Sequence, residues 1–583
     1  MNHIPLTLSD MVVIGGYLIV VLCVGLYFRK RMHGAGDYFA AGHQVPWWLA
    51  GISHYMSGAS ALTFVGYAQT AYTYGWVAVS LAWTGIPASI LGGLFFARRW
   101  RRARVVTPVE FLERRFNIYV RQLFAWAGIP MHMIEDGLKL FATALFLSVG
   151  FNIPVTWAVV VCGIITVGYT FFGGLWALMV TDYVQFVMKV LAICLLLPLA
   201  VWRAGGIHHA FESLPPSFFH ATGGQYNWLY LIGFGTMLSI TLNGSWALAQ
   251  KYYSVRDDRE ASKAAYLATG LRLIGGPMMI VPAILGRKFL PDLIAQHRTG
   301  DVYVLLVINL MPAGLVGIVV AALLSATMAT VSSDFSSIAS VITKDVYQRL
   351  FRPDLTSQQL VTAGRVVTLF VGGASTLAGL YLSLGGDRAF LDLMVVIASA
   401  FLAPSFLPLM GALVSRRLNS QGIVLGYVLG LSTGLSLLAI RNWAPGFWPW
   451  LHANYSGGAI LINTGVTIAG MIVGSLLSRT SAVEAKKAEV FFAMEHTPVR
   501  AVENADNTES AIMRQRIVAY TTGAVGVLLA VAGLLATSTG ARITDLSVAF
   551  ILIALAWQRL RSHPATRAHL TPSDEPEAVP PKL

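Results

Sequence analysis

Charged residues are scarce in this chain. Only 12% of its 583 residues are Asp, Glu, Lys or Arg, whereas 56% are hydrophobic. Soluble globular domains carry about 25% charged residues, so this chain has too few to coat a water-soluble body. The composition excludes a soluble enzyme, a disordered protein and a secreted disulfide scaffold. It predicts an all-α integral membrane protein whose partner is the lipid bilayer.

Cysteine and catalytic motifs are equally sparse. The three cysteines, Cys23, Cys162 and Cys194, lie inside apolar runs, where they are typical small core residues. They indicate neither disulfides nor a metal site. The sequence has no Walker motif, which argues against an ATP-driven pump. It also has no nucleophile–base pair or metal-ligand cluster, so we expect no enzymatic activity.

The net charge of +13 reflects topology rather than a nucleic-acid partner. Lys and Arg cluster beside apolar runs, as in residues 98–104, and such clusters mark cytoplasmic loops. In the first apolar run, residues 8–28, the basic cluster follows the run, whereas in a signal peptide it precedes it. We therefore expect a retained first helix. The pattern places the chain in the cell (inner) membrane, with its N-terminus outside and its C-terminus in the cytoplasm.

A membrane-spanning helix needs roughly 20 mainly apolar residues, which gives about fifteen transmembrane helices. They are expected to begin near Leu8, Pro46, Trp76, Tyr119, Val155, Leu175, Trp228, Ala264, Pro312, Leu360, Ala389, Ile423, Ala459, Ile517 and Ile543. The inner loops of this topology carry most cations, Lys251 among them. A charged inner segment near the C-terminus predicts an amphipathic helix over Ala482–Met494.

Small and hydroxylated residues interrupt two of these helices. Ser57, Gly58 and Ser60 lie in the middle of the second, where they indicate either a backbone break that lines a cavity or a close helix–helix contact. In the ninth, one face collects hydroxyls that suit a dehydrating Na⁺. That face is made of Ala326, Thr330, Ser333 and Ser337. The adjacent Asp334 is an intramembrane carboxylate, which is a functional candidate by default.

The fourth helix carries a polar stripe of His132, Glu135, Asp136 and Lys139 at helical spacing. Lys139 can pair with either acid, which leaves about one acid uncompensated, and Lys189 of the sixth helix is the expected counter-charge. Three interpretations stay open. The stripe is a buried structural ion network, an acidic site that recognises a substrate amine, or a proton-coupling carboxylate.

Four runs resemble the sodium:solute symporter family. They are the Gly-Gly-Leu-x-Ala-x-x-x-Thr-Asp-x-x-Gln run at residues 173–185, the run at 326–330 leading to Thr343-Lys344-Asp345, the Thr-Pro-Val-Glu-Phe run from residue 107, and Gln250-Lys251. The resemblance covers roughly residues 8–479. It implies a five-plus-five inverted-repeat (LeuT-like) transporter core. The expected organisation is an N-terminal helix with inner loop (1–45), a first repeat (46–202), an external loop (203–227), a second repeat (228–415), two peripheral helices (416–478), a charged cytoplasmic segment (479–516), a C-terminal helix pair (517–561) and a disordered tail (562–583).

The resemblance also implies a sodium site between the second and ninth helices. Its ligands would be the carbonyls of Met56, Ala59 and Ala326 and the hydroxyl of Thr330. Many family members have Ser where this chain has Ala329, so one ligand oxygen is missing. Members with a second cation use an aspartate that matches Asp182 and hydroxyls near Ser332 and Ser333; the alternative is that Asp182 only gates the inner vestibule.

These observations predict a secondary active transporter that imports a small organic solute with Na⁺ by alternating access, with Na⁺ as its coupling ion and no organic cofactor. The expected pocket residues are Ser57, Gly58, Ser60, Thr63, Glu135, Asp136, Asn243, Ser245 and Trp246. One rival is a proton-coupled porter using Glu135 or Asp136, and another is a transporter-like sensor or channel. The sequence defines neither the substrate nor the oligomeric state.

Overall fold

The protein is entirely helical in the part that the structure describes. The computed structural model describes residues 7–29, 34–58, 61–151, 153–212, 214–296, 299–312, 315–384, 390–444, 446–499, 507–536 and 539–561. These residues form no β-strand, only two isolated bridges. The predicted tail at 562–583 lies outside the described residues, as do Ala59 and Ser60 and the side chain of Thr63.

The first predicted repeat contains the helices of the N-terminal half. They are α3 (Trp47–Ser57), α4 (Ala61–Tyr74), α5 (Val77–Trp83), α6 (Gly85–Leu91), the π-helical η2 (Gly92–Phe96), α7 (Ala97–Arg102), α8 (Glu110–Arg115), α9 (Ile118–Phe151) and α10 (Val155–Arg203). The predicted external loop holds two short helices, α11 (Ile207–Glu212) and η3 (Pro216–Phe219).

The second predicted repeat follows that loop. It contains α12 (Trp228–Gly244), α13 (Trp246–Tyr253), α14 (Asp258–Phe289), η4 (Pro291–Leu293), η5 (Thr299–Asp301), α15 (Val302–Leu310), α16 (Leu315–Ser340), the π-helical η6 (Val341–Phe351), α17 (Ser357–Ser383) and α18 (Phe390–Val414).

The remaining helices lie before and after the two repeats. They are α1 (Leu8–Arg29), α2 (Ala35–Ala40), η1 (Ala41–His43), α19 (Ser420–Trp443), α20 (Pro449–Ala453), α21 (Tyr455–Leu477), α22 (Ala482–His496), α23 (Asn507–Leu535) and α24 (Thr539–Arg561). The helix predicted at Ala482–Met494 is therefore present as α22.

Eleven of the described helices are long and apolar enough to cross a membrane, or twelve if the bent pair α12–α13 is one span. The predicted count of about fifteen is not confirmed. Part of the difference lies in α10, whose 49 residues are broken at Gly174 (φ 56°). At 1.5 Å per residue α10 is about 74 Å long, more than twice the hydrocarbon thickness of about 30 Å, so this one helix is long enough for two crossings.

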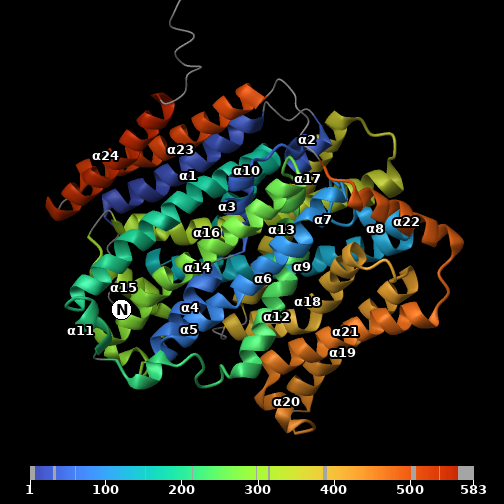
Figure 1. Cartoon of the computed structure of the whole chain (residues 1–583). Helices are drawn as coiled ribbons and strands as arrows, with labels where there is room; N and C mark the ends of the chain where they lie inside the picture. The colour runs from blue at the N-terminus through green and yellow to red at the C-terminus, as the bar shows by residue number, and fades with distance from the viewer. Residues whose placement is uncertain are drawn as a thin grey trace, which may run out of the picture.

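The first helix of each predicted repeat is interrupted. The α3 helix ends at Ser57, and α12 ends at Gly244 with a bend of 50° before α13. A broken helix frees peptide groups that lipid cannot satisfy, so it must be enclosed by protein. The enclosing core includes α16, which is buried along its whole length and contacts α3, α9, α10 and α13 (Figure 1).

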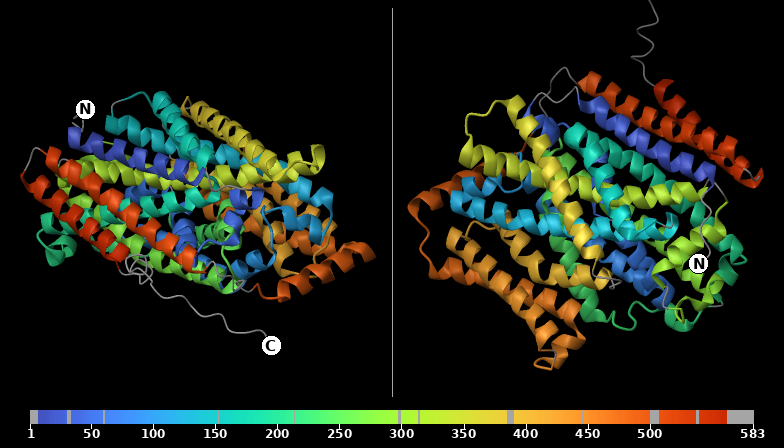
Figure 2. Two further views of the ribbon diagram at one scale, coloured as in Figure 1. Left: turned by 90° about the horizontal axis from the view of Figure 1, so that it is seen from above. Right: turned by 180° about the vertical axis from the view of Figure 1, so that it is seen from behind.

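Peripheral helices cover two opposite sides of this core. On one side α1 packs on α10 and α16, α23 packs on α1, and α24 packs on α23 (Figure 1). On the other side α19 and α21 pack on each other and on α18. Both layers are visible from behind and from above in Figure 2.

Two glycines set the distance between α9 and α17. A Cβ built on Gly379 would lie 2.8 Å from the carbonyl oxygen of Gly137, and one built on Gly137 would lie 2.8 Å from the amide nitrogen of Gly379. Small residues allow such close approach of backbones in membranes. Gly137 follows Asp136 directly, so this contact also fixes the depth of the polar stripe on α9.

We expect Gly379→Ala to destabilise the protein. The added methyl group forces α9 and α17 apart, at a cost of about 1–3 kcal/mol, and lowers the melting temperature of the purified protein. Gly373→Ala is the matched control, because it lies on the same helix with no atom within 4 Å of the new Cβ. Equal melting temperatures for the two variants would contradict the role assigned to this contact.

Candidate functional site

A cavity of about 140 Å³ lies among α3, α9, α12, α16 and α18. It reaches both helix breaks, since Ser57 and Gly58 line it on one side and Ser245 on the other. The charged and hydroxylated lining from α9 and α16 consists of His132, Glu135, Lys139, Thr330 and Asp334. The interrupted helices and the polar stripe therefore meet in one enclosed space.

Lys139 joins three carboxylates in this space. Its Nζ lies 2.7 Å from Oδ2 of Asp334, 3.0 Å from Oε1 of Glu135 and 3.3 Å from Oδ1 of Asp136. Within the described residues, Oδ2 of Asp136 and Nε2 of His132 are buried without a hydrogen-bond partner. One ammonium thus serves three acids, and two polar atoms beside them remain unsatisfied.

The break in α3 packs against the middle of α16. The Oγ atoms of Ser57 and Ser333 are 2.9 Å apart, and Met56 shares an apolar cluster with Ala329. The Thr330 hydroxyl donates to the carbonyls of Ala326 and Thr327, at 3.1 and 2.9 Å. The predicted ligands Met56, Ala326 and Thr330 thus belong to two helices in direct contact.

Asp182 of α10 has two partners that the sequence did not indicate. The Ser53 hydroxyl donates to its carboxylate, and Lys251 Nζ lies 3.9 Å from Oδ2. The same Nζ donates to Ser333 Oγ at 3.0 Å. Lys251 was predicted in an inner loop, which is wrong, because it is fully buried in α13. Its ammonium lies between Asp182 and Ser333, two members of the predicted second cation site.

The chain matches known transporters along most of its length. The model of the sodium:solute symporter family matches residues 38–430. The chain belongs to the sodium:solute symporter family. It is a secondary active transporter that couples a small organic solute to Na⁺.

Symporters with known substrates are among its relatives. A sodium/sialic acid symporter of Aliivibrio fischeri is 27% identical over 434 residues, which is 72% of this chain and 85% of the relative. A sodium/glucose cotransporter of Rattus norvegicus is 27% identical over 485 residues, which is 74% of this chain and 71% of the relative. These relatives are transporters, not enzymes.

A solved structure supports the fold. It is a Na⁺-coupled sialic acid symporter in a substrate-bound, outward-open state, with a TM-score of 0.70 and 23% identity. The match covers 82% of this chain and 99% of that chain. The symporter therefore has the five-plus-five transporter fold that its sequence resembles.

Four predicted site residues lie elsewhere than expected. Asp136 was expected in the pocket, but its side chain is fully buried outside the cavity lining. Lys189 does not supply a counter-charge to the stripe; its Nζ lies 4.5 Å from the ring centroid of Tyr55 and 4.9 Å from that of Phe64. Asn243 lies outside the cavity lining and donates to the carbonyls of Ala88 and Ser239. Trp246 also lies outside the lining and packs on the His132 ring.

Sequence reasoning missed Arg272 of α14. Its guanidinium donates to the carbonyl oxygen of His54 at 3.3 Å and to Ser89 Oγ at 3.0 Å. A Cβ on Gly58 would lie 2.6 Å from Nη2 of Arg272, so the arginine lies directly behind the break in α3. The available signal was an arginine inside the apolar run of the eighth predicted helix, because charged residues there are rare and functional.

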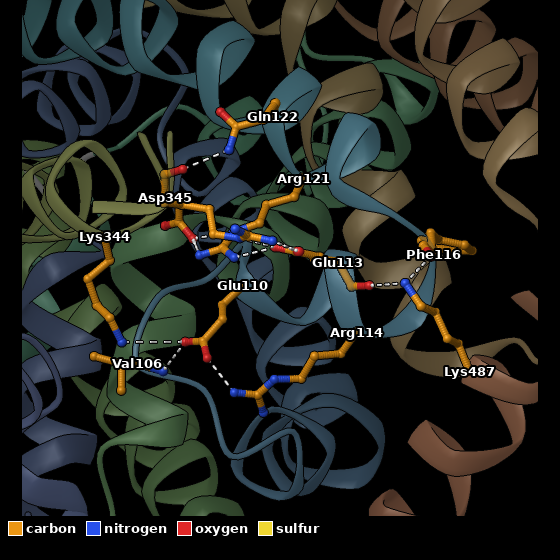
Figure 3. Close-up of polar contacts among 11 residues, drawn as sticks. Val106, Glu110, Glu113, Arg114, Phe116, Arg121, Gln122, Lys344, Asp345 and Lys487 are labelled. Carbon is orange, nitrogen blue, oxygen red and sulfur yellow. Dashed lines mark hydrogen bonds and ion pairs between the residues drawn. The ribbon is translucent and has the colours of Figure 1, made fainter. Parts of the chain in front are cut away.

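The motif that begins with Thr-Pro-Val-Glu-Phe continues to Phe116, and its α8 helix lies in a second polar centre (Figure 3). Glu113 pairs with Arg121 of α9 at 2.5 Å and with Arg349 of η6 at 2.7 Å. Arg121 also pairs with Asp345 of η6 at 2.5 Å. Lys487 of α22 donates to the carbonyl of Glu113 at 3.2 Å. This network ties α8 to α9, η6 and α22.

We expect Lys139→Met to destabilise the symporter strongly, because it leaves three carboxylates without their shared ammonium. Removing one partner of a buried ion pair costs about 3–5 kcal/mol. Adding Asp334→Asn removes one of the three unpaired negative charges, so it should restore part of the lost stability. The measurement is the melting temperature of the wild type, the two single variants and the double variant in a double-mutant cycle. Lys263→Met, at an exposed position of α14, is the control. A double variant no more stable than Lys139→Met alone would contradict the shared ion pair.

We expect Glu113→Gln to lower stability at neutral pH and to have little effect in acid. Hydrogen bonds from Arg349 and Arg121 lower the pKa of Glu113 from 4.5 to about 2. A depressed carboxyl pKa stabilises the folded state above the unfolded value, and this gain is lost as the pH falls through the folded value. The melting-temperature gap between wild type and Glu113→Gln should therefore narrow from about pH 4.5 downward. Glu489→Gln, an exposed change on α22, should show no such gap. A gap independent of pH would contradict this assignment.

Proposed function

We propose that the symporter imports its solute by alternating access, with Na⁺ held where the break in α3 meets α16. The observation that carries this proposal is the buried contact of Met56 and Ser57 with Ala329 and Ser333. A cation at this contact holds the two helices together. It favours whichever state offers it more ligands, and this difference in affinity is all that coupling requires.

The ligands we propose are the carbonyls of Met56, Ala59 and Ala326 and the hydroxyl of Thr330. Thr330 donates its proton to backbone carbonyls of its own helix. A donating hydroxyl keeps its lone pairs, so it can still accept a cation. Ala329 contributes no oxygen, which leaves the ion less tightly held and favours its release to the inside.

We propose that Asp182 acts through Lys251 and does not hold a second Na⁺. The Lys251 ammonium already lies within reach of Asp182 and Ser333. Because α10 carries Asp182 and α13 carries Lys251, this ion pair links the inner half of a broken helix to the core. The arrangement supports the gating role expected for Asp182.

We propose that the symporter lies in the inner membrane with its N-terminus outside and its C-terminus in the cytoplasm. The distribution of Lys and Arg supports this orientation. The α8 network would then lie on the cytoplasmic side, next to α22.

The direct test is the melting temperature of the purified protein titrated with NaCl, against equal KCl. A ligand that binds only the folded state stabilises it by RT ln(1 + [L]/Kd). We expect a saturable, Na⁺-specific rise. Thr330→Ala should raise the half-saturating Na⁺ concentration about tenfold, because the free energy of one polar contact to a charged group corresponds to a change of about that size in Kd.

Thr368→Ala is the matched control, since Thr368 makes the same hydroxyl bond to a carbonyl four residues earlier, but on α17. It should keep the Na⁺ response of the wild type. An unchanged Na⁺ requirement in Thr330→Ala would contradict the site. A melting temperature that changes with pH but not with the Na⁺ concentration would favour the proton-coupled porter that uses Glu135 or Asp136.

A further inference from the structure

The lining of the central cavity combines two kinds of chemistry. The part formed by α9 and α16, the charged end, carries Glu135, Lys139 and Asp334. The lining from α12 and α18 is mostly apolar and partly aromatic, and includes Phe234, Met237, Leu238, Leu402 and Phe406. The occupant that suits such a cavity has one charged group and a small apolar body.

The charged end is negative. Glu135, Asp136 and Asp334 share one ammonium, which gives the group a formal charge of −2. If one of the three acids is protonated, the group still carries −1. Lys139 is the only Lys or Arg among the described residues that line the cavity. An anionic solute would therefore meet like charge.

Three acids already hold Lys139. It donates hydrogen bonds to Oδ2 of Asp334 at 2.7 Å and to Oδ1 of Asp136 at 3.3 Å, and its Nζ lies 3.0 Å from Oε1 of Glu135. A solute carboxylate would have to compete with all three for this one ammonium. Glu135, in contrast, keeps 30% of its side chain exposed, whereas Asp136 keeps none. Asp334 keeps 10% exposed, so Glu135 is the most accessible of the three acids to a solute.

His132 lies beside Glu135 in the cavity wall. Its side chain is buried and lines the cavity, and its Nε2 is enclosed by protein without a partner within the described residues. The ring centroid lies 4.7 Å from that of Trp246 and 5.5 Å from that of Phe406. His132 therefore helps to shape the wall next to Glu135, and Glu135 supplies the accessible charge.

We propose that the solute of this symporter is a small organic amine, whose cationic group binds Glu135 while its apolar part lies against Phe234, Met237 and Phe406. The inference rests on the proposed Na⁺-coupled import and names its substrate class. A cation supplied by the solute offsets the negative charge that Lys139 leaves. Aromatic rings nearby add a favourable interaction with a positive group.

The test uses the purified full-length protein in saturating NaCl and measures melting temperature. The cationic probes are choline and butylamine. The uncharged analogues are 3,3-dimethylbutan-1-ol for choline and 1-butanol for butylamine, and the anions are N-acetylneuraminate and lactate. We expect at least one amine to raise the melting temperature saturably, its uncharged analogue to give no rise, and the anions to give none.

The same titration is repeated with Glu135→Gln, Glu135→Asp and Glu489→Gln. We expect Glu135→Gln to weaken amine binding about tenfold or more, the scale of one contact to a charged group. Glu135→Asp should recover part of the affinity, and Glu489→Gln should match the wild type. The Na⁺-induced rise in the absence of solute shows that each variant is folded.

Four results would overturn the amine proposal. Three are a rise in melting temperature from an anion or an uncharged analogue with none from any amine, no rise from any probe in the presence of a normal Na⁺ response, and an unchanged amine affinity in Glu135→Gln. The fourth is loss of the Na⁺ response in a Glu135→Gln protein that still melts in one cooperative transition, which would place the coupling ion at the acidic end. Failure of the import proposal looks different, because an amine response without any Na⁺ response would reject Na⁺ coupling and leave the amine site standing.

Discussion

The structure depends on the requirement that every peptide group in a membrane finds a partner inside the protein. The breaks after Ser57 and Gly244 violate helical pairing at membrane depth. They are tolerable because fully buried α16 and the neighbouring helices enclose them, and because Arg272 donates to the carbonyl of His54 beside the first break. The protein interior around the two breaks can therefore hold unpaired peptide groups, and for the same reason it can hold an ion and a polar solute.

Buried lysines give this space its electrostatic organisation. Lys139 of α9 serves three acids, two on its own helix and Asp334 on α16, and Lys251 of α13 faces Asp182 of α10. Each ammonium joins helices from different repeats or from different halves of the fold. Charges that would be costly in hydrocarbon thus determine which helices lie together.

Much of this arrangement could be predicted from the sequence because it depends on local patterns. Hydropathy located most of the helices, and the Ser57-Gly58 pair indicated either a break or a close helix–helix contact. Helical spacing placed His132, Glu135, Asp136 and Lys139 on one stripe. Periodicity assigns a residue to a face of its own helix, but it does not say which other helix meets that face.

The errors have the same physical origin. The sequence assigned Lys189 as counter-charge to the stripe, whereas the structure places Lys189 over the rings of Tyr55 and Phe64. The partner that the stripe gains from another helix is a further acid, Asp334, which lies 195 positions after Lys139 and accepts a hydrogen bond from it. The sequence also placed Lys251 in a loop, because a lysine after an apolar run is normally exposed, whereas here the chain continues as a buried half-helix. The sequence predicted separate helices from Val155 and from Leu175, whereas the structure joins them in one 49-residue helix that is broken at Gly174.

The C-terminal pair changes the shape that the molecule presents to its surroundings. Because α23 packs on α1 and α24 on α23, each lies one helix further from the solute cavity. Neighbouring helices are about 8–10 Å apart, so the lateral footprint extends by two helix widths on one side only. Annular lipids there contact helices that take no part in the cavity. Changes in bilayer thickness at that edge therefore act on α23 and α24. On the other sides of the molecule they act on helices that lie next to the moving core.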